Sequence, residues 1–165
     1  MAKKCVVWDL DNTLWDGICL EGDVHVRPVV RDVVNELDQR GIIHSIASRN
    51  EEKVALKVLN DNRLFHFFVV PQINWLPKTT NIIAISKALN ISLDAVAFVD
   101  DDPFELDQIR FMLPDVLTID SANTSQILDM PEFNPGIVTK ESKSRREFYQ
   151  AEEKRKQAEQ HFSSA

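Results

Sequence analysis

Short apolar segments alternate along this chain with longer segments in which apolar residues recur three or four positions apart. The first pattern is typical of strands buried on both faces, and the second of helices with one buried face. We therefore expect strands at 5–8, 42–47, 67–70, 95–99 and 116–119, and helices at 28–40, 51–59, 78–89 and directly after residue 103. This order predicts an α/β fold of the Rossmann-like kind, with a five-stranded parallel sheet and helices on both of its faces.

The pattern changes at about residue 134. Residues 141–162 are rich in charged side chains and poor in apolar ones, so we expect a solvated, charged C-terminal helix that packs through a narrow stripe. A chain of 165 residues is long enough for one domain with its own core. We expect residues 1–133 to form that core and residues 134–165 to be a helical extension of the same domain.

Charge and composition argue against several classes of protein. The formal net charge of −7 disfavours a general nucleic-acid binder, because such proteins are usually basic. No apolar run approaches the roughly 20 residues of a membrane-spanning helix, and the first residues lack the pattern of a signal peptide. The two cysteines, Cys5 and Cys19, indicate no disulfide framework. We therefore expect a cytoplasmic protein with neither a nucleic-acid nor a membrane partner.

Polar side chains gather where the expected strands end. Asp9 and Asp11 follow the first strand, and Lys78 opens the helix after the third. The second strand is followed by Ser48, Arg49 and Asn50, and the fourth by Asp100 and Asp101. Because the carboxyl ends of parallel strands form one edge of the sheet, where ligands bind in such folds, these clusters should meet there.

Each cluster alone has an ordinary structural explanation. Asp9 and Asp11 fit a turn, Asn50 a helix N-cap, Lys78 a surface lysine, and Arg49 suits a surface charge as well as a substrate contact. Together they suit phosphate chemistry. A divalent cation lets one anion approach another, Asp9 can attack phosphorus, and cationic and hydroxyl groups stabilise the phosphoryl oxygens.

The combination resembles the haloacid dehalogenase-like (HAD) phosphohydrolase superfamily. It comprises Asp9-x-Asp11-x-Thr13, then Ser48, Lys78 and Asp100-Asp101, and it covers roughly residues 5–120. The resemblance implies that Asp9 is the nucleophile and Asp11 the general acid/base, with Ser48 and Lys78 binding phosphate beside Arg49 and Asn50. It implies Mg²⁺ as cofactor, held by Asp9, Asp100, the Asp11 backbone carbonyl and Asp101, the last as a direct ligand or a supporting group.

The lengths of two connections and several further segments narrow the resemblance to one branch of the superfamily. Residues 15–28 are expected to be a short loop, and residues 50–78 hold only one helix and one strand, so no cap domain fits and the site should be open. The chain is similar to FkbH-like proteins over most of its length, in the segments 9–17, 47–50, 73–78, 98–105 and 139–149. That branch implies a glyceryl transferase/phosphatase of polyketide-type biosynthesis. It dephosphorylates D-1,3-bisphosphoglycerate and passes the glyceryl unit through a cysteine thioester to an acyl carrier protein.

Cys19 is the candidate for the thiol that this activity needs. Gly17 permits a turn that would bring Cys19 back towards the strand ends, and His25 is the nearest candidate base in the sequence. A free cysteine is, however, more often a small buried residue in a packed loop. The extension also carries the basic residues Lys140, Lys143, Arg145 and Arg146. They could form a face that binds an acidic carrier protein, or they could simply be the solvated face of a helix.

Two other functions fit the same residues. A capless Mg²⁺-dependent HAD phosphatase would use the same aspartates on a small phosphate ester or a phosphoprotein and leave Cys19 idle. A non-catalytic binding module on this fold is the second, although the intact Asp9, Asp11, Lys78 and Asp100 argue against it. The pathway, the carrier protein, the order of the two reactions and the oligomeric state stay open.

Overall fold

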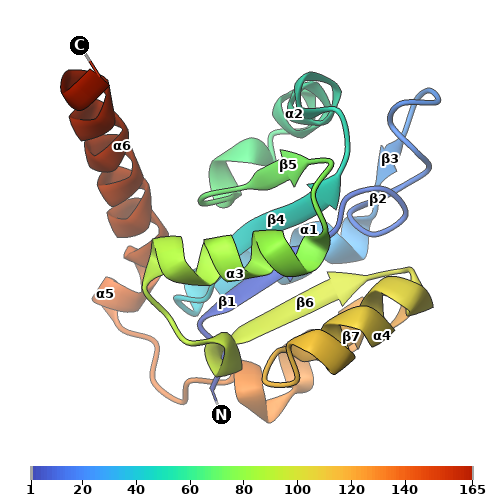
Figure 1. Cartoon of the computed structure of the whole chain (residues 1–165). Coiled ribbons are helices and arrows are strands. Elements are labelled where there is room, and N and C mark those ends of the chain that lie inside the picture. The colour runs from blue at the N-terminus through green and yellow to red at the C-terminus, as the bar shows by residue number, and fades with distance from the viewer. Residues whose placement is uncertain (1, 165) are drawn as a thin grey trace.

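A computed structural model describes the backbone of residues 2–164 and the side chains of residues 2–161. Within this range, five parallel strands form one sheet in the order β5-β4-β1-β6-β7 (Figure 1). The strands are β1 (Cys5–Trp8), β4 (Ile43–Arg49), β5 (Gln72–Asn74), β6 (Val96–Asp100) and β7 (Leu117–Asp120). The expected α/β fold with a five-stranded parallel sheet is therefore confirmed.

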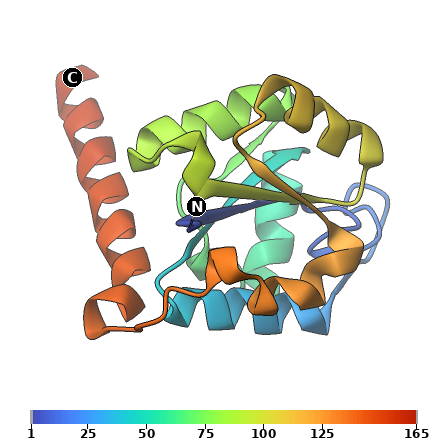
Figure 2. The same ribbon diagram turned by 90° about the horizontal axis from the view of Figure 1, so that it is seen from below.

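Helices cover both faces of the sheet, and the alternation of β1 explains why. Val6 and Trp8 face one core, while Cys5 and Val7 face the other, because successive side chains of a strand point to opposite faces. The first core is closed by α1 (Pro28–Gln39), α2 (Glu52–Asp61) and the 3₁₀ segment Ser121–Asp129, and the second by α3 (Lys78–Leu89) and α4 (Pro103–Met112). The two layers lie on opposite sides of the sheet in Figure 2.

The third strand was expected at 67–70, and that prediction is wrong. Residues Phe65–Phe67 form a 3₁₀ turn, and Phe68 makes only an isolated bridge to His44. Val70 has a φ of +46°, which no extended strand tolerates, so apart from the Phe68 bridge the chain forms its ladder with β4 only after this residue, in β5. The apolar run supplies side chains to the core rather than a strand to the sheet.

Residues 15–28, expected to be a loop, contain a small antiparallel hairpin. Its strands are β2 (Trp15–Asp16) and β3 (His25–Val26). Gly17 turns with a φ of +99°, as its glycine identity predicts, and Asp16 is joined to Arg27 by an ion pair of 2.7 Å between Oδ1 and Nε. Strands of two residues leave almost no periodic signal, which explains why the sequence pattern did not reveal them.

The C-terminal part forms α5 (Lys140–Lys143) and α6 (Arg145–Ser164), and α6 stands beside the β5 end of the sheet (Figure 1). Arg146 Nε binds Asp38 Oδ1 at 2.9 Å, and Glu153 Oε2 accepts a hydrogen bond from the Val70 N–H at 3.2 Å. Arg145 donates to the Gly41 carbonyl. Both arginines therefore fasten the helix to the core, which weakens the idea that they face a carrier protein, whereas Lys140 and Lys143 are exposed.

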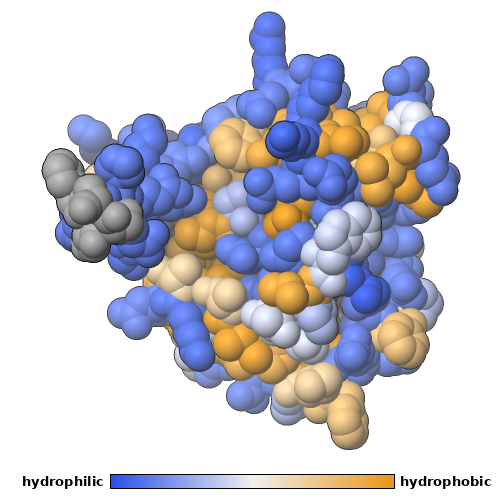
Figure 3. Space-filling view, turned by 45° about the horizontal axis from the view of Figure 1, so that its top comes forward, coloured by the Kyte–Doolittle hydropathy of each residue, from blue (hydrophilic) through white to orange (hydrophobic). Residues whose placement is uncertain are grey.

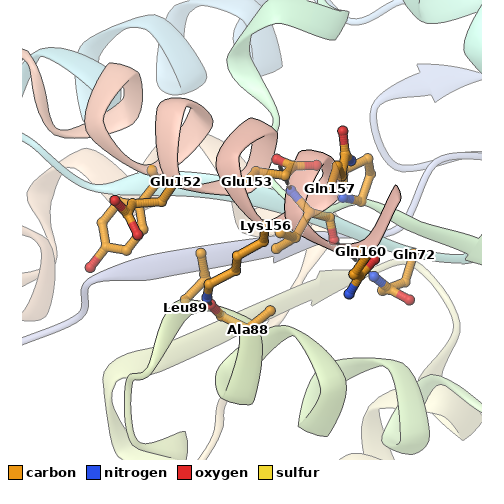
Figure 4. Close-up of a pocket in the computed structure, with 11 residues that line it drawn as sticks. Gln72, Ala88, Leu89, Glu152, Glu153, Lys156, Gln157 and Gln160 are labelled. Atoms are coloured by element: carbon orange, nitrogen blue, oxygen red, sulfur yellow. Dashed lines mark hydrogen bonds between the residues drawn. The ribbon is translucent and has the colours of Figure 1, made fainter. Parts of the chain in front are cut away.

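A cavity of about 390 Å³ lies between α6, the chain before β5 and the last turn of α3 (Figure 4). Glu152, Lys156 and Gln160 line it from α6, and Leu89 from α3. Leu89 ends α3, whereas Lys78 begins it, so this cavity lies at the opposite end of that helix from the expected site. Among the described residues, no helix is both long and apolar enough to cross a membrane.

A buried histidine connects the central strand to α1. The Trp8 indole N–H donates to His44 Nδ1 at 2.9 Å, and His44 Nε2 lies 3.1 Å from the Val34 carbonyl oxygen. A neutral ring with its proton on Nε2 satisfies both contacts. Burial is the main cause that lowers the pKa of His44 from 6.5 to about 3.

We predict that His44 makes the fold sensitive to acid. Below pH 6.5 the unfolded chain takes up a proton that the native His44 does not, so this contribution is complete above pH 6.5 and is lost as the pH falls towards about 3. The slope is about 1.4 kcal/mol for each pH unit. Urea unfolding from about pH 7 to about pH 4 should show a steeper loss of stability for the wild type than for His44→Gln; equal slopes would contradict the prediction.

Candidate active site

The central strand β1 leads directly into the site. Asp9 follows β1, and its backbone N–H still donates to the Val99 carbonyl of β6 at 3.0 Å, which continues the ladder by one residue. Asp100 is the last residue of β6, and Lys78 is the first residue of α3. These elements are neighbours in the fold, so the sheet edge brings together side chains that are up to 91 positions apart in the sequence.

Lys78 is the centre of a buried ion cluster. Its Nζ lies 2.6 Å from Asp100 Oδ2 and 3.1 Å from Asp9 Oδ1. Only 7% of Lys78, 6% of Asp9 and none of Asp100 is exposed. Thr13, also fully buried, donates towards Asp9 Oδ2 and Asp101 Oδ1, both at 3.2 Å. The predicted Asp9, Lys78, Asp100 and Asp101 are thus in one place.

Burial and mutual charge control how these groups titrate. Desolvation raises the pKa of Asp9 well above its usual range; Lys78 opposes that shift, and Asp100 adds to it. Burial by itself would lower the pKa of Lys78, but the charges of Asp9 and Asp100 outweigh it and raise the pKa. Burial and the neighbouring Asp100 raise the pKa of Asp101. Lys78 therefore stays protonated, and further positive charge would favour the ionised forms of Asp9 and Asp101.

The acidic cluster has the donors for a hard cation. One carboxylate oxygen from each of Asp9, Asp100 and Asp101 lies within 4.8 Å of the other two. Carboxylate oxygens are the ligands that Mg²⁺ prefers, and a divalent cation offsets the repulsion of gathered carboxylates. The donor set therefore fits Mg²⁺. Asp11 was expected to contribute only its backbone carbonyl, and its side chain is occupied elsewhere.

The Asp11 carboxylate is held by three neutral donors. Oδ1 accepts from the Trp15 indole N–H at 2.9 Å and from the Cys19 backbone N–H at 3.0 Å, and Oδ2 accepts from Asn50 Nδ2 at 3.0 Å. Asn50 was also considered as the N-cap of the following helix. Its Oδ1 does accept the Glu51 N–H at 3.0 Å, but Glu51 itself occupies the cap position, so Asn50 is better described as a partner of Asp11.

Cys19 folds back onto Asp11 rather than onto Asp9. Its Sγ lies 3.5 Å from Asn50 Oδ1, and the residue is 7% exposed. Burial, followed by the charge of Asp11, raises the pKa of the thiol to about 11, so it is protonated at neutral pH. His25 lies exposed on β3, and the groups placed at Cys19 are Asn50 and Asp11.

Ser48 and Arg49 end β4. Ser48 is buried in the position expected of a phosphate binder at this edge. The Arg49 guanidinium forms an ion pair with the buried Glu105 of α4 and is about half exposed. Arg49 thus has a structural partner that its sequence position did not suggest. Asp102 caps α4, because its Oδ1 accepts the Phe104 N–H.

Sequence reasoning gave no role to Thr13, Trp15 and Glu105. Thr13 is the last residue of the Asp9-x-Asp11-x-Thr13 motif and Trp15 lies two positions after it, so their position was the available signal. Their contacts depend on how the chain turns after Asn12, which has a φ of +57°, and no periodicity reports such a turn. Glu105 had no signal at all, since its partner Arg49 lies 56 positions away.

Comparison with solved structures identifies the fold. The N-terminal part of the protein BF1531 from Bacteroides fragilis, which contains a phosphatase domain and is complexed with Mg, aligns with a TM-score of 0.71 and 29% identity over 81% of this chain. This chain spans 40% of that one. A HAD-superfamily hydrolase from Ehrlichia chaffeensis shares the fold, with a TM-score of 0.57 and 14% identity over 73% of this chain and 87% of that one. No protein-family model and no curated protein matches the chain.

The fold is therefore that of the HAD phosphatases, as the resemblance implied. The donors expected for Mg²⁺ are present in this chain as the Asp9, Asp100 and Asp101 cluster, and the similar BF1531 domain is itself complexed with Mg.

We predict that Asp100→Asn weakens Mg²⁺ binding by at least about tenfold, because it removes one charge and alters the partner of Lys78. Isothermal titration with MgCl₂ measures the change. Asp102→Asn is the matched control, since it makes the same substitution two positions away, where asparagine also serves as an N-cap. Equal affinities for wild type and Asp100→Asn would show that the cation binds elsewhere.

Proposed function

We propose that this protein is a Mg²⁺-dependent phosphohydrolase in which Asp9 is the nucleophile. The observation that carries the proposal is the buried cluster of Asp9, Lys78, Asp100 and Asp101 at the carboxyl edge of a HAD phosphatase fold. The presence of Mg in the phosphatase domain of BF1531 supports it. The two free cysteines agree with a cytoplasmic setting, which is part of the proposal.

The reaction follows from the roles of the side chains. A bound Mg²⁺ supplies the positive charge that lets the Asp9 carboxylate approach a phosphoryl group. An Asp9 oxygen forms a bond to phosphorus, the bond to the leaving oxygen breaks, and Asp11 in its acid form gives that oxygen a proton. Lys78 and Ser48 stabilise the phosphoryl oxygens. Asp11 then takes a proton from the water that attacks the aspartyl-phosphate and releases inorganic phosphate.

The chain connections around the site suggest that it is open to large substrates. Between β4 and α3 the chain forms only α2, a 3₁₀ turn and the short β5, and between β1 and α1 only the hairpin. Neither connection is long enough for a cap domain. An open site suits a phosphate carried on a large partner, such as a phosphoprotein or an acyl carrier, as well as a small phosphate ester.

We predict that Asp9→Asn abolishes phosphate release from p-nitrophenyl phosphate and acetyl phosphate in the presence of Mg²⁺, because an amide cannot carry the phosphoryl group. The wild type should form a covalent phosphoenzyme that is visible by intact-protein mass spectrometry. Asp23→Asn, in an exposed part of the hairpin loop, is the matched control and should leave the rate unchanged. A rate that is equal in the wild type and Asp9→Asn would favour a non-catalytic binding module instead.

One observation favours a second activity, the glyceryl transfer that the FkbH-like resemblance implies. The thiol of Cys19 lies against Asn50, and its backbone N–H binds Asp11. Its sulfur could attack the acyl carbon of a 1,3-bisphosphoglycerate-like acyl phosphate: the C–S bond forms, the C–O bond breaks, and phosphate leaves. Because the pKa of the thiol is about 11, a base must take its proton, and the Asp11 carboxylate is the nearest one. A carrier-protein thiol would then accept the glyceryl unit.

Intact-protein mass spectrometry after incubation with 1,3-bisphosphoglycerate tests this second activity. We predict a glyceryl adduct in the wild type that is absent from Cys19→Ala, because only Cys19 lies at the site. Cys5→Ala is the matched control, since Cys5 is buried in β1 on the other side of the sheet from the Cys19 core. Phosphate release without an adduct would leave the phosphatase as the sole activity.

A further inference from the structure

We propose that Trp15 and Asn50 are positioning residues that hold the Asp11 carboxylate in the geometry for proton transfer. The inference rests on the proposed phosphohydrolase function and adds to it a device for orienting the acid/base. Trp15 Nε1 and Asn50 Nδ2 bind different oxygens of Asp11, at 2.9 Å and 3.0 Å, and the Cys19 backbone N–H binds Oδ1 at 3.0 Å. The carboxylate is thus held from both of its ends.

The three donors form a clamp on the Asp11 carboxylate, and the two side chains among them are buried. Trp15 is fully buried and Asn50 is 1% exposed, whereas Asp11 is only partly buried. Trp15 belongs to β2, which is paired with β3, and Asn50 is anchored by its backbone N–H to the Asn74 carbonyl at 3.3 Å. The hairpin and the end of β4 therefore meet at one carboxylate. Fixing a reacting group in this way lowers the cost of reaching the transition state.

The clamp also leaves one hydrogen-bond acceptor site of Asp11 free for the reaction. An ionised carboxylate has about four lone-pair sites, and the three donors occupy three of them. One site remains for the leaving oxygen or for the attacking water. None of the three donors is a member of the Asp9, Asp100 and Asp101 cluster, so removing one should affect proton transfer without altering the cation site.

This separation suggests a test based on the leaving group. An alkyl phosphate needs a proton on its leaving oxygen, whereas an acyl phosphate leaves readily without one. Trp15→Phe, which keeps the ring and deletes the donor, should lower kcat/KM for a primary alkyl phosphate such as glycerol 3-phosphate by about 10- to 100-fold. For acetyl phosphate, kcat/KM should change by less than about threefold. Asn50→Ala should show the same selective loss.

Trp8→Phe is the matched control. It also deletes a buried indole N–H, the donor to His44, but in the core rather than at the site. It should alter the unfolding midpoint and leave the ratio of the two kcat/KM values unchanged. In an Asp11→Asn background, Trp15→Phe should cause no further loss, because the indole then has no acid to position.

The outcomes separate the two proposals. A wild type that hydrolyses neither phosphate overturns the phosphohydrolase function and this inference with it. A wild type that hydrolyses both, with Trp15→Phe lowering both kcat/KM values equally, leaves the function intact and overturns the positioning role. A further loss in the Asp11→Asn background also overturns it, because Trp15 would then act through another group.

Discussion

The structure depends on the electrostatic balance around Lys78. Three carboxylates, those of Asp9, Asp100 and Asp101, meet at the end of a buried sheet, and one ammonium group faces them. If all four are ionised, one positive charge against three negative charges leaves a net charge of −2. A buried net charge of this size is costly. A divalent cation has the charge that would neutralise this −2. The cluster that destabilises the fold is therefore also suited to bind Mg²⁺.

The architecture keeps this cluster rigid. β1 is the central strand, with β4 on one side and β6 on the other, and all four of its residues are buried. Its hydrogen bonds continue past its end to Asp9, so the proposed nucleophile is held by the strand ladder rather than placed on a free loop. Lys78 gains the same rigidity from the first turn of α3.

The β2–β3 hairpin after β1 has a different role from that of the sheet. It carries Trp15 and leads to Cys19, and both reach Asp11. One carboxylate is therefore the meeting point of the proposed phosphatase chemistry and of the proposed thioester chemistry. Whether Asp11 gives its proton to a leaving oxygen or takes one from Cys19 depends on the substrate that is bound. This arrangement would let one acid/base group serve two reactions in turn.

The sequence by itself determined the α/β class, the central strands and most of the acidic cluster. The continuous apolar run of β1 and the helical spacing in α1 are local patterns, and Asp9, Lys78 and Asp100 lie where such strands and helices end or begin. Only the tertiary structure decided the position of β5, the hairpin, the partner of Arg49 and the clamp on Asp11. A left-handed Val70, two-residue strands and a contact between Asp11 and Asn50 across 39 positions leave no periodic trace. They arise from packing between distant segments, which local patterns do not encode.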